Sequence, residues 1–103
     1  MIDQYSGKQS LLKQLSNELQ FPSYFGNNWD ALDECLRDLS WLPQRNVYLI
    51  HKTLPSLPEK QLKVYLSVLA TATHFWLEHP EHEFWVAFAE SDKETVSSLL
   101  RNI

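Results

Sequence analysis

The sequence is poor in glycine, cysteine and positive charge, and each shortage argues against a class of function. Two glycines in 103 residues leave no glycine-rich loop of the kind that binds nucleotide phosphates. The single cysteine, Cys35, has no partner for an intramolecular disulfide, so stability must come from packing, as is usual in reducing compartments. Nine Lys and Arg against 13 Asp and Glu give a formal net charge of −4, which opposes nucleic-acid binding and favours a basic partner.

Membrane segments and targeting signals are also missing. No apolar run approaches the roughly 18 residues of a membrane span, and the first four residues, MIDQ, do not resemble a signal peptide. We therefore expect a cytoplasmic protein that does not contact membranes. Hydrophobic residues make up 44% of the chain and include four tryptophans, which is enough for one packed core. The expected organisation is a single domain over residues 1–103.

Apolar residues at three- and four-residue spacing predict four helical regions. They cover residues 10–19, 27–40, 58–79 and 92–102. A proline shortly after each of the first three regions is consistent with the predicted ends. The third region is long enough for one helix or for two shorter ones.

Short apolar runs predict strands over residues 47–50 and 84–89. Both runs are apolar throughout, which predicts strands that are covered on both faces. The helical connection between them predicts a parallel β-α-β unit, and therefore an α/β fold with a small parallel sheet. Residues 1–5 could form a further short strand, although they show no clear alternation.

The second helical region has an apolar side and an acidic side. At about 100° per residue, the apolar side contains Trp29, Leu32, Cys35, Leu36 and Leu39. The opposite side carries Asp30, Asp33 and Glu34, and Arg37 is placed to pair with Asp33 or Glu34. Acids in a first helical turn also favour the helix dipole, an explanation that needs no partner. Three acids in five residues, after a loop with two adjacent aromatics, are denser than a solvated helix requires and also allow a binding surface, so both explanations stay open at this point.

Two residues of this helix allow more than one role. Cys35 lies beside Asp33 and Glu34, which raise the pKa of a thiol, so we expect inert packing and not nucleophilic catalysis. Trp29 lies at the border between the two sides. Core packing and contact with a partner are both open for this side chain.

The most specific motif occupies residues 21–36, FPSYFGNNWDALDECL. It resembles the signature of the barstar family, intracellular ribonuclease inhibitors, and the order of helices and strands along most of the chain is similar as well. The resemblance implies a three-stranded parallel sheet flanked by helices, to which this chain adds a C-terminal helix. It also implies inhibition by occlusion, in which the acidic helix and the preceding loop cover the active site of a basic, barnase-type ribonuclease.

The family's contacts can be carried over to this sequence. Tyr24 corresponds to an aromatic contact, Gly26 and Asn28 to loop contacts, Asp30 to the first acidic contact, and Glu34 to the main phosphate-mimicking aspartate. The full set of expected partner-binding residues is Tyr24, Gly26, Asn28, Trp29, Asp30, Asp33 and Glu34.

Two positions depart from the family pattern. Glu34 is one methylene longer than the family's aspartate, and Asp33 stands where the namesake inhibitor has a tryptophan. The longer carboxylate of Glu34 can still reach a guanidinium, whereas the extra charge of Asp33 in place of an aromatic side chain moves the expected interface toward electrostatics. An alternative function is therefore a barstar-fold interaction or immunity module that binds another basic protein or a nuclease toxin.

Other kinds of site are disfavoured. Residues 78–82, EHPEH, together with His74, concentrate metal-binding residue types, but their spacing matches no common zinc site and Pro80 interrupts the helix. Asp30 and Glu34 could form a catalytic carboxylate pair, yet an exposed helix face provides no cleft to shift one pKa. We therefore predict no metal, no cofactor and no enzymatic activity.

Overall fold

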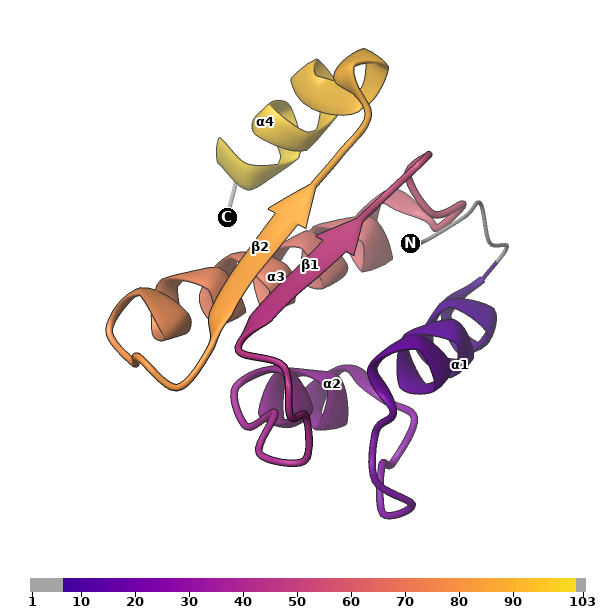
Figure 1. The fold of residues 1–103 in the computed structure, drawn as a ribbon. Helices are drawn as coiled ribbons and strands as arrows, with labels where there is room; N and C mark the ends of the chain where they lie inside the picture. Colours follow the sequence, from indigo (N-terminus) through magenta and orange to yellow (C-terminus); the bar gives the residue numbers. More distant parts are fainter. Residues whose placement is uncertain (1–6, 102–103) are drawn as a thin grey trace.

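The computed structural model of the chain describes residues 7–101, which form an α/β fold with four α-helices and a two-stranded parallel sheet (Figure 1). A short 3-10 turn, Glu90–Asp92, precedes the last helix. The elements in chain order are α1 (Lys8–Leu19), α2 (Trp29–Leu36), β1 (Asn46–Ile50), α3 (Glu59–Leu77), β2 (Glu83–Ala87) and α4 (Lys93–Arg101). The predicted α/β class and the order of the elements are confirmed.

The sheet consists of β1 and β2 in parallel, with Val47 opposite Phe84 and Leu49 opposite Val86. The predicted β-α-β unit is therefore confirmed, with α3 as its connection. The expected third strand is not seen within residues 7–101. The segment for which that strand was predicted, residues 1–5, lies outside the described residues.

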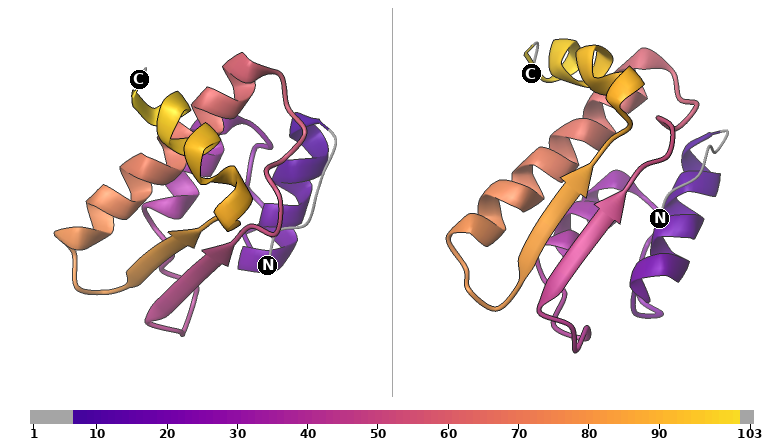
Figure 2. Two further views of the ribbon diagram at one scale, coloured as in Figure 1. Left: turned by 90° about the horizontal axis from the view of Figure 1, so that it is seen from above. Right: turned by 45° about the horizontal axis from the view of Figure 1, so that its top comes forward.

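The expectation that both faces of the sheet are covered is wrong for the described part of the chain. The helices lie on one face of the sheet, as Figure 2 shows. Val47 and Leu49 are buried, whereas Tyr48 is 58% exposed and the neighbouring Trp85 is 54% exposed. Successive side chains of a strand point to opposite faces, so a continuous apolar run supplies two apolar faces even where helices cover only one.

The amphipathic pattern correctly identified the buried residues of α1. Leu11, Leu12, Leu15 and Leu19 are all in the core. The helix ends at Gln20, which has a left-handed backbone conformation (φ 55°). The amide of Gln20 donates a hydrogen bond to the carbonyl of Ser16. This ending matches the common left-handed C-cap of helices.

The helix α3 is one continuous helix of 19 residues, which decides between the two predicted possibilities. Its core-facing residues are Leu62, Tyr65, Leu66, Leu69, Ala72 and Trp76. The helix α4 packs on α3 through its buried residues Val96 and Leu99, as its spacing predicted. Within residues 7–101, none of the helices combines the length and the apolar character that a membrane crossing requires.

Two tryptophans hold the C-terminal ends of α1 and α2. The indole Nε1 of Trp41 donates to the carbonyl of Leu19 at 2.9 Å, and that of Trp76 donates to the carbonyl of Leu36 at 2.7 Å. The last carbonyls of a helix lack partners within the helix, so each indole satisfies one such group. The bond from Trp76 fixes the end of α2 against α3.

A buried histidine joins the ends of both strands to α3. His51 directly follows β1; its Nδ1 donates to the carbonyl of Ala87 at 3.0 Å, and its Nε2 accepts from the hydroxyl of Tyr65 at 2.6 Å. This assignment of the ring proton follows because a carbonyl oxygen can only accept. Burial lowers the pKa of His51 from 6.5 to about 4, so the ring is neutral at pH 7.

Candidate protein-binding site

The start of α2 is fixed by an asparagine cap. The Oδ1 atom of Asn28 accepts from the amide of Ala31 at 2.7 Å, and its Nδ2 donates to the carbonyl of Gly26 at 3.2 Å. Asn28, and not the neighbouring Asn27, is therefore the cap. A Cβ atom at Gly26 would lie 3.2 Å from Nδ2 of Asn28, so a larger residue would push on the cap. The loop and the helix thus meet in one defined orientation.

The two sides of α2 differ in exposure as their spacing predicted. Leu32, Cys35 and Leu36 are buried. Asp30 and Glu34, one helical turn apart on the other side, are both exposed to solvent. The helix therefore presents two carboxylates that make no contribution to the apolar core.

Asp33 has a different environment from the other two acids. Arg37 binds it in a bidentate manner, with Nη2 at 2.8 Å from Oδ2 and Nε at 3.2 Å from Oδ1. The predicted pairing of Arg37 is confirmed with Asp33 as its partner. The charge of Asp33 is therefore balanced within the chain, and Asp33 is less available than Asp30 or Glu34.

The loop before α2 projects one aromatic ring into solvent. Phe21 and Phe25 are buried with ring centroids 4.8 Å apart, and the amide of Phe25 donates to the carbonyl of Pro22. Between these anchors, Tyr24 is 71% exposed. The two buried rings hold the loop while the tyrosine remains free to contact another molecule.

A shallow hollow of about 110 Å³ lies between this loop and α2. Tyr24 of the loop and Glu34 of the helix line it, and Asp38 lines it as well. Asp38 is missing from the residues predicted from the sequence, although it continues the four-residue spacing of Asp30 and Glu34. Asp30 does not line the hollow, so the predicted acids do not all meet at one point.

Comparison with known protein families identifies the family of the chain that carries this surface. A family model described as barstar (barnase inhibitor) matches residues 2–89. The chain belongs to the barstar family. Searches of curated proteins and of solved structures found no match.

Membership in the barstar family confirms the resemblance of residues 21–36 and extends it over most of the chain. The family consists of inhibitors and not of enzymes, in agreement with the prediction. The match ends at residue 89, before α4, and the prediction that this helix is extra relative to the family stays a prediction.

Trp29 packs against the core of this barstar-family chain. Its side chain is half-buried, its ring centroid lies 6.0 Å from that of Tyr65, and the Nζ atom of Lys8 lies 5.5 Å from the centroid of its ring. Core packing is therefore one role of Trp29. Its contact with a partner stays a prediction.

Cys35 is a packing residue with a poorly ionisable thiol. It is buried, and its pKa is raised by burial first and by the charges of Asp38 and Glu34 second. A raised pKa leaves little thiolate at neutral pH, which makes the group a weak nucleophile. The acidic surrounding predicted from the sequence is present, with Asp38 in place of Asp33.

The EHPEH segment does not form a metal centre in the described part of the chain. Within residues 7–101, no three His, Cys, Asp or Glu side chains gather as metal ligands would. His79 instead stacks on Phe75 with centroids 3.9 Å apart, and its Nδ1 donates to the carbonyl of Phe75 at 2.7 Å. This ring closes the C-terminal end of α3.

Proposed function

We propose that the chain inhibits a basic, barnase-type ribonuclease by covering its active site with the acidic side of α2 and the loop before it. The family description supports the type of target, and the surface chemistry supports the region used. A ribonuclease that binds RNA must place cationic groups around the phosphates of its substrate. Carboxylates can replace those phosphates because they form charge-assisted hydrogen bonds with the same Lys and Arg side chains.

The observation that carries this proposal is the exposed pair Asp30 and Glu34 on a helix that is rigidly capped. Asn28 fixes the first turn, and the bond from Trp76 to Leu36 fixes the last one. The two carboxylates are thereby held at a constant spacing before the partner arrives. Preorganised groups lose little conformational entropy on binding, which favours high affinity.

Tyr24 and the hollow beside it support the same region. The exposed ring offers apolar area with a hydroxyl at its tip, a combination that is common at the centre of protein interfaces. The hollow between Tyr24, Glu34 and Asp38 is large enough to accept the end of one basic side chain. We assign Glu34, with Asp38 next to it, as the main acceptor of a Lys or Arg of the ribonuclease.

The direct test titrates ribonuclease activity of several barnase-type enzymes with this protein at low and at high salt. We expect stoichiometric inhibition, with association that slows as salt screens the charges. The double variant Asp30→Asn/Glu34→Gln should lose inhibition. The matched control Glu90→Gln/Glu94→Gln removes two exposed acids from the opposite end of the chain and should inhibit like wild type. Inhibition that survives in the first variant would overturn the proposed site.

One observation favours a second candidate, the binding of a different basic protein or nuclease toxin. Asp33 and Arg37 form a closed ion pair at the position where the namesake inhibitor has a tryptophan. A partner that requires an aromatic contact there would fit this pair poorly. If the barnase-type panel is not inhibited, a toxin with polar groups opposite the Asp33–Arg37 pair becomes the target to test.

We also propose that the protein acts inside the cell that makes it. A ribonuclease inhibitor protects cellular RNA only where the RNA is, and the lone, buried Cys35 is compatible with a reducing compartment.

A further inference from the structure

The outer edge of β2 has no strand partner within residues 7–101. The backbone groups of Glu83 and Ala87 hydrogen-bond across to the β1 chain. Because the bonding residues alternate along a parallel strand, the backbone N–H and C=O groups of Phe84 and Val86 point away from β1. An open strand edge of this kind is a template for another strand unless charges, proline or a covering element protect it.

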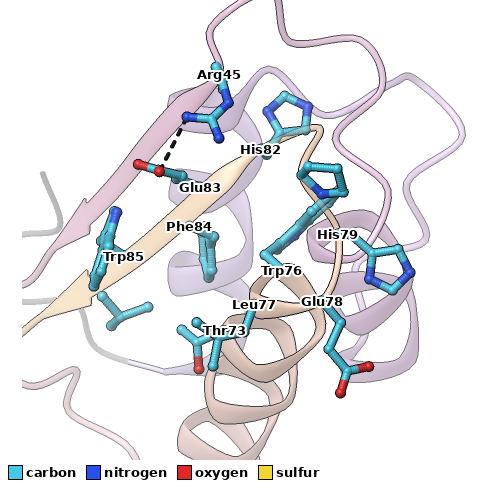
Figure 3. A pocket seen from close by; sticks show the side chains of 12 residues that line it. Arg45, Thr73, Trp76, Leu77, Glu78, His79, His82, Glu83, Phe84 and Trp85 are labelled. Carbon is cyan, nitrogen blue, oxygen red and sulfur yellow. Dashed lines mark ion pairs between the residues drawn. The ribbon is translucent and has the colours of Figure 1, made fainter.

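A groove of about 600 Å³ runs beside this edge, between β2 and the C-terminal end of α3 (Figure 3). Phe84 and Trp85 line it from the strand, and Trp76 and Leu77 line it from the helix. Leu77 is 79% exposed. Large apolar side chains that gather in one exposed hollow mark a binding site more often than scattered ones do.

The charges around the groove are negative. Glu78 and Glu83 line it, and Glu81 lies in the loop that joins them. The one Lys or Arg in its lining, Arg45, is already paired with Glu83 at 3.2 Å. Within residues 7–101, Glu78 lies 4.0 Å from Nε2 of His74, and no ion pair of Glu81 is seen. The groove therefore complements a basic ligand.

We propose that the open edge of β2 and this groove bind an extended polypeptide segment in which apolar and basic residues alternate. The segment adds a strand to β2 by bonding to the backbone of Phe84 and Val86. Its side chains then alternate between the two faces of the sheet. One set enters the groove between Phe84 and Leu77, and the other lies beside Trp85, where a Lys or Arg finds an aromatic face.

A second copy of this chain is the main competing occupant. Its net charge of −4 and its own acidic groove would be repelled by the carboxylates at this edge. None of the residues that line the groove belongs to α2 or to the loop before it, so the proposal does not depend on ribonuclease inhibition.

The probe for the test is a synthetic peptide of alternating lysine and valine, about seven residues long, which covers the five residues of β2 with both ends capped. Binding is followed by amide chemical shifts and by hydrogen exchange of the labelled protein. We expect saturable shifts and slowed exchange at Phe84 and Val86. The same peptide methylated on every backbone nitrogen should not bind, because it retains the charges but cannot pair as a strand.

Two variants test the role of the acids without touching the core. Glu78→Gln/Glu81→Gln should weaken peptide binding by roughly threefold to tenfold, and Glu90→Gln/Glu94→Gln should leave it unchanged. The proposal would be overturned if the chemical-shift changes appeared on α2 instead, or if the methylated peptide bound equally well. Either result would mean that the peptide binds through non-specific charge attraction. Protection of Phe84 and Val86 by self-association, without the peptide, would overturn it in favour of a second copy.

Discussion

On one side of α2, Asp30 and Glu34 meet solvent; on the other side, Leu32, Cys35 and Leu36 are covered by the core and by α3. The exposed carboxylates contribute little to folding, since surface charges without a close partner are worth a fraction of a kcal/mol. The buried side holds the helix in place, and the proposed interface does not use it. Substitutions on the two sides should therefore separate affinity from stability.

The largest expected effect is on affinity. Glu34→Ala should weaken binding of an inhibited ribonuclease by about 2–5 kcal/mol, because it leaves a desolvated cation unpaired; the barnase–barstar complex is itself a standard example of such a charged hot spot. The free energy of unfolding should hardly change. Competition binding measures the first quantity and urea denaturation the second. Glu94→Ala is the matched control, and equal small losses at both positions would contradict the proposed geometry.

The next largest effect is expected in the core, where the buried His51 should make the free energy of unfolding depend on pH. The folded chain takes up this proton only near pH 4, whereas the unfolded chain takes it up near pH 6.5, so protonation favours unfolding. The contribution of His51 is complete above about pH 6.5 and is lost as pH falls toward 4, by about 3 kcal/mol in all. Urea denaturation across this range measures the loss.

The control for that measurement is His51→Gln, which removes the titrating group. The variant is less stable at pH 7 because it disturbs the bonds to Tyr65 and Ala87, but its stability should fall less steeply between pH 6.5 and 4. Identical slopes in both proteins would show that carboxylates alone set the pH dependence.

A smaller effect on the free energy of unfolding is expected at Cys35, which lies on the buried side of α2. Cys35→Ala removes a buried sulfur and leaves a small void, so it should lower the free energy of unfolding by about 1 kcal/mol. Affinity for the ribonuclease should stay within error, as measured by inhibition of its activity. Loss of binding in a folded Cys35→Ala protein would mean that the buried side of α2 is not separate from the interface.

The sequence pattern predicted the helices well because apolar spacing directly reflects which side is buried. It placed the end of α2 near Ser40, whereas the helix ends at Leu36. Leu39 is nevertheless fully buried, with a left-handed backbone (φ 50°). Periodicity correctly indicated that Leu39 is in the core, but it contains no information on how the chain turns after Arg37.

The open face of the sheet could not be predicted in this way. Tyr48 and Trp85 belong to runs that are apolar throughout, and such runs do not say whether a helix covers each face. The site shows the same limit. Local rules left two possible partners for Arg37, of which the structure has Asp33, whereas Asp38 depends on how the chain continues past the helix. The contacts carried over from the barstar family remain predictions for this chain.

The smallest expected effect is on the rate of association and concerns Arg37, which pairs with Asp33 on the acidic side of α2. Arg37→Ala frees Asp33 from its ion pair, which costs less than about 1 kcal/mol of stability because both groups are partly exposed. It also makes the surface more negative, so association with a basic ribonuclease should become faster at low salt, and the gain should vanish at high salt. Stopped-flow binding measures this rate. Arg45→Ala is the matched control, because it removes the same charge from the start of β1. Slower association of the Arg37→Ala variant alone would mean that Arg37 itself contacts the partner and that Asp33 acts mainly by positioning it.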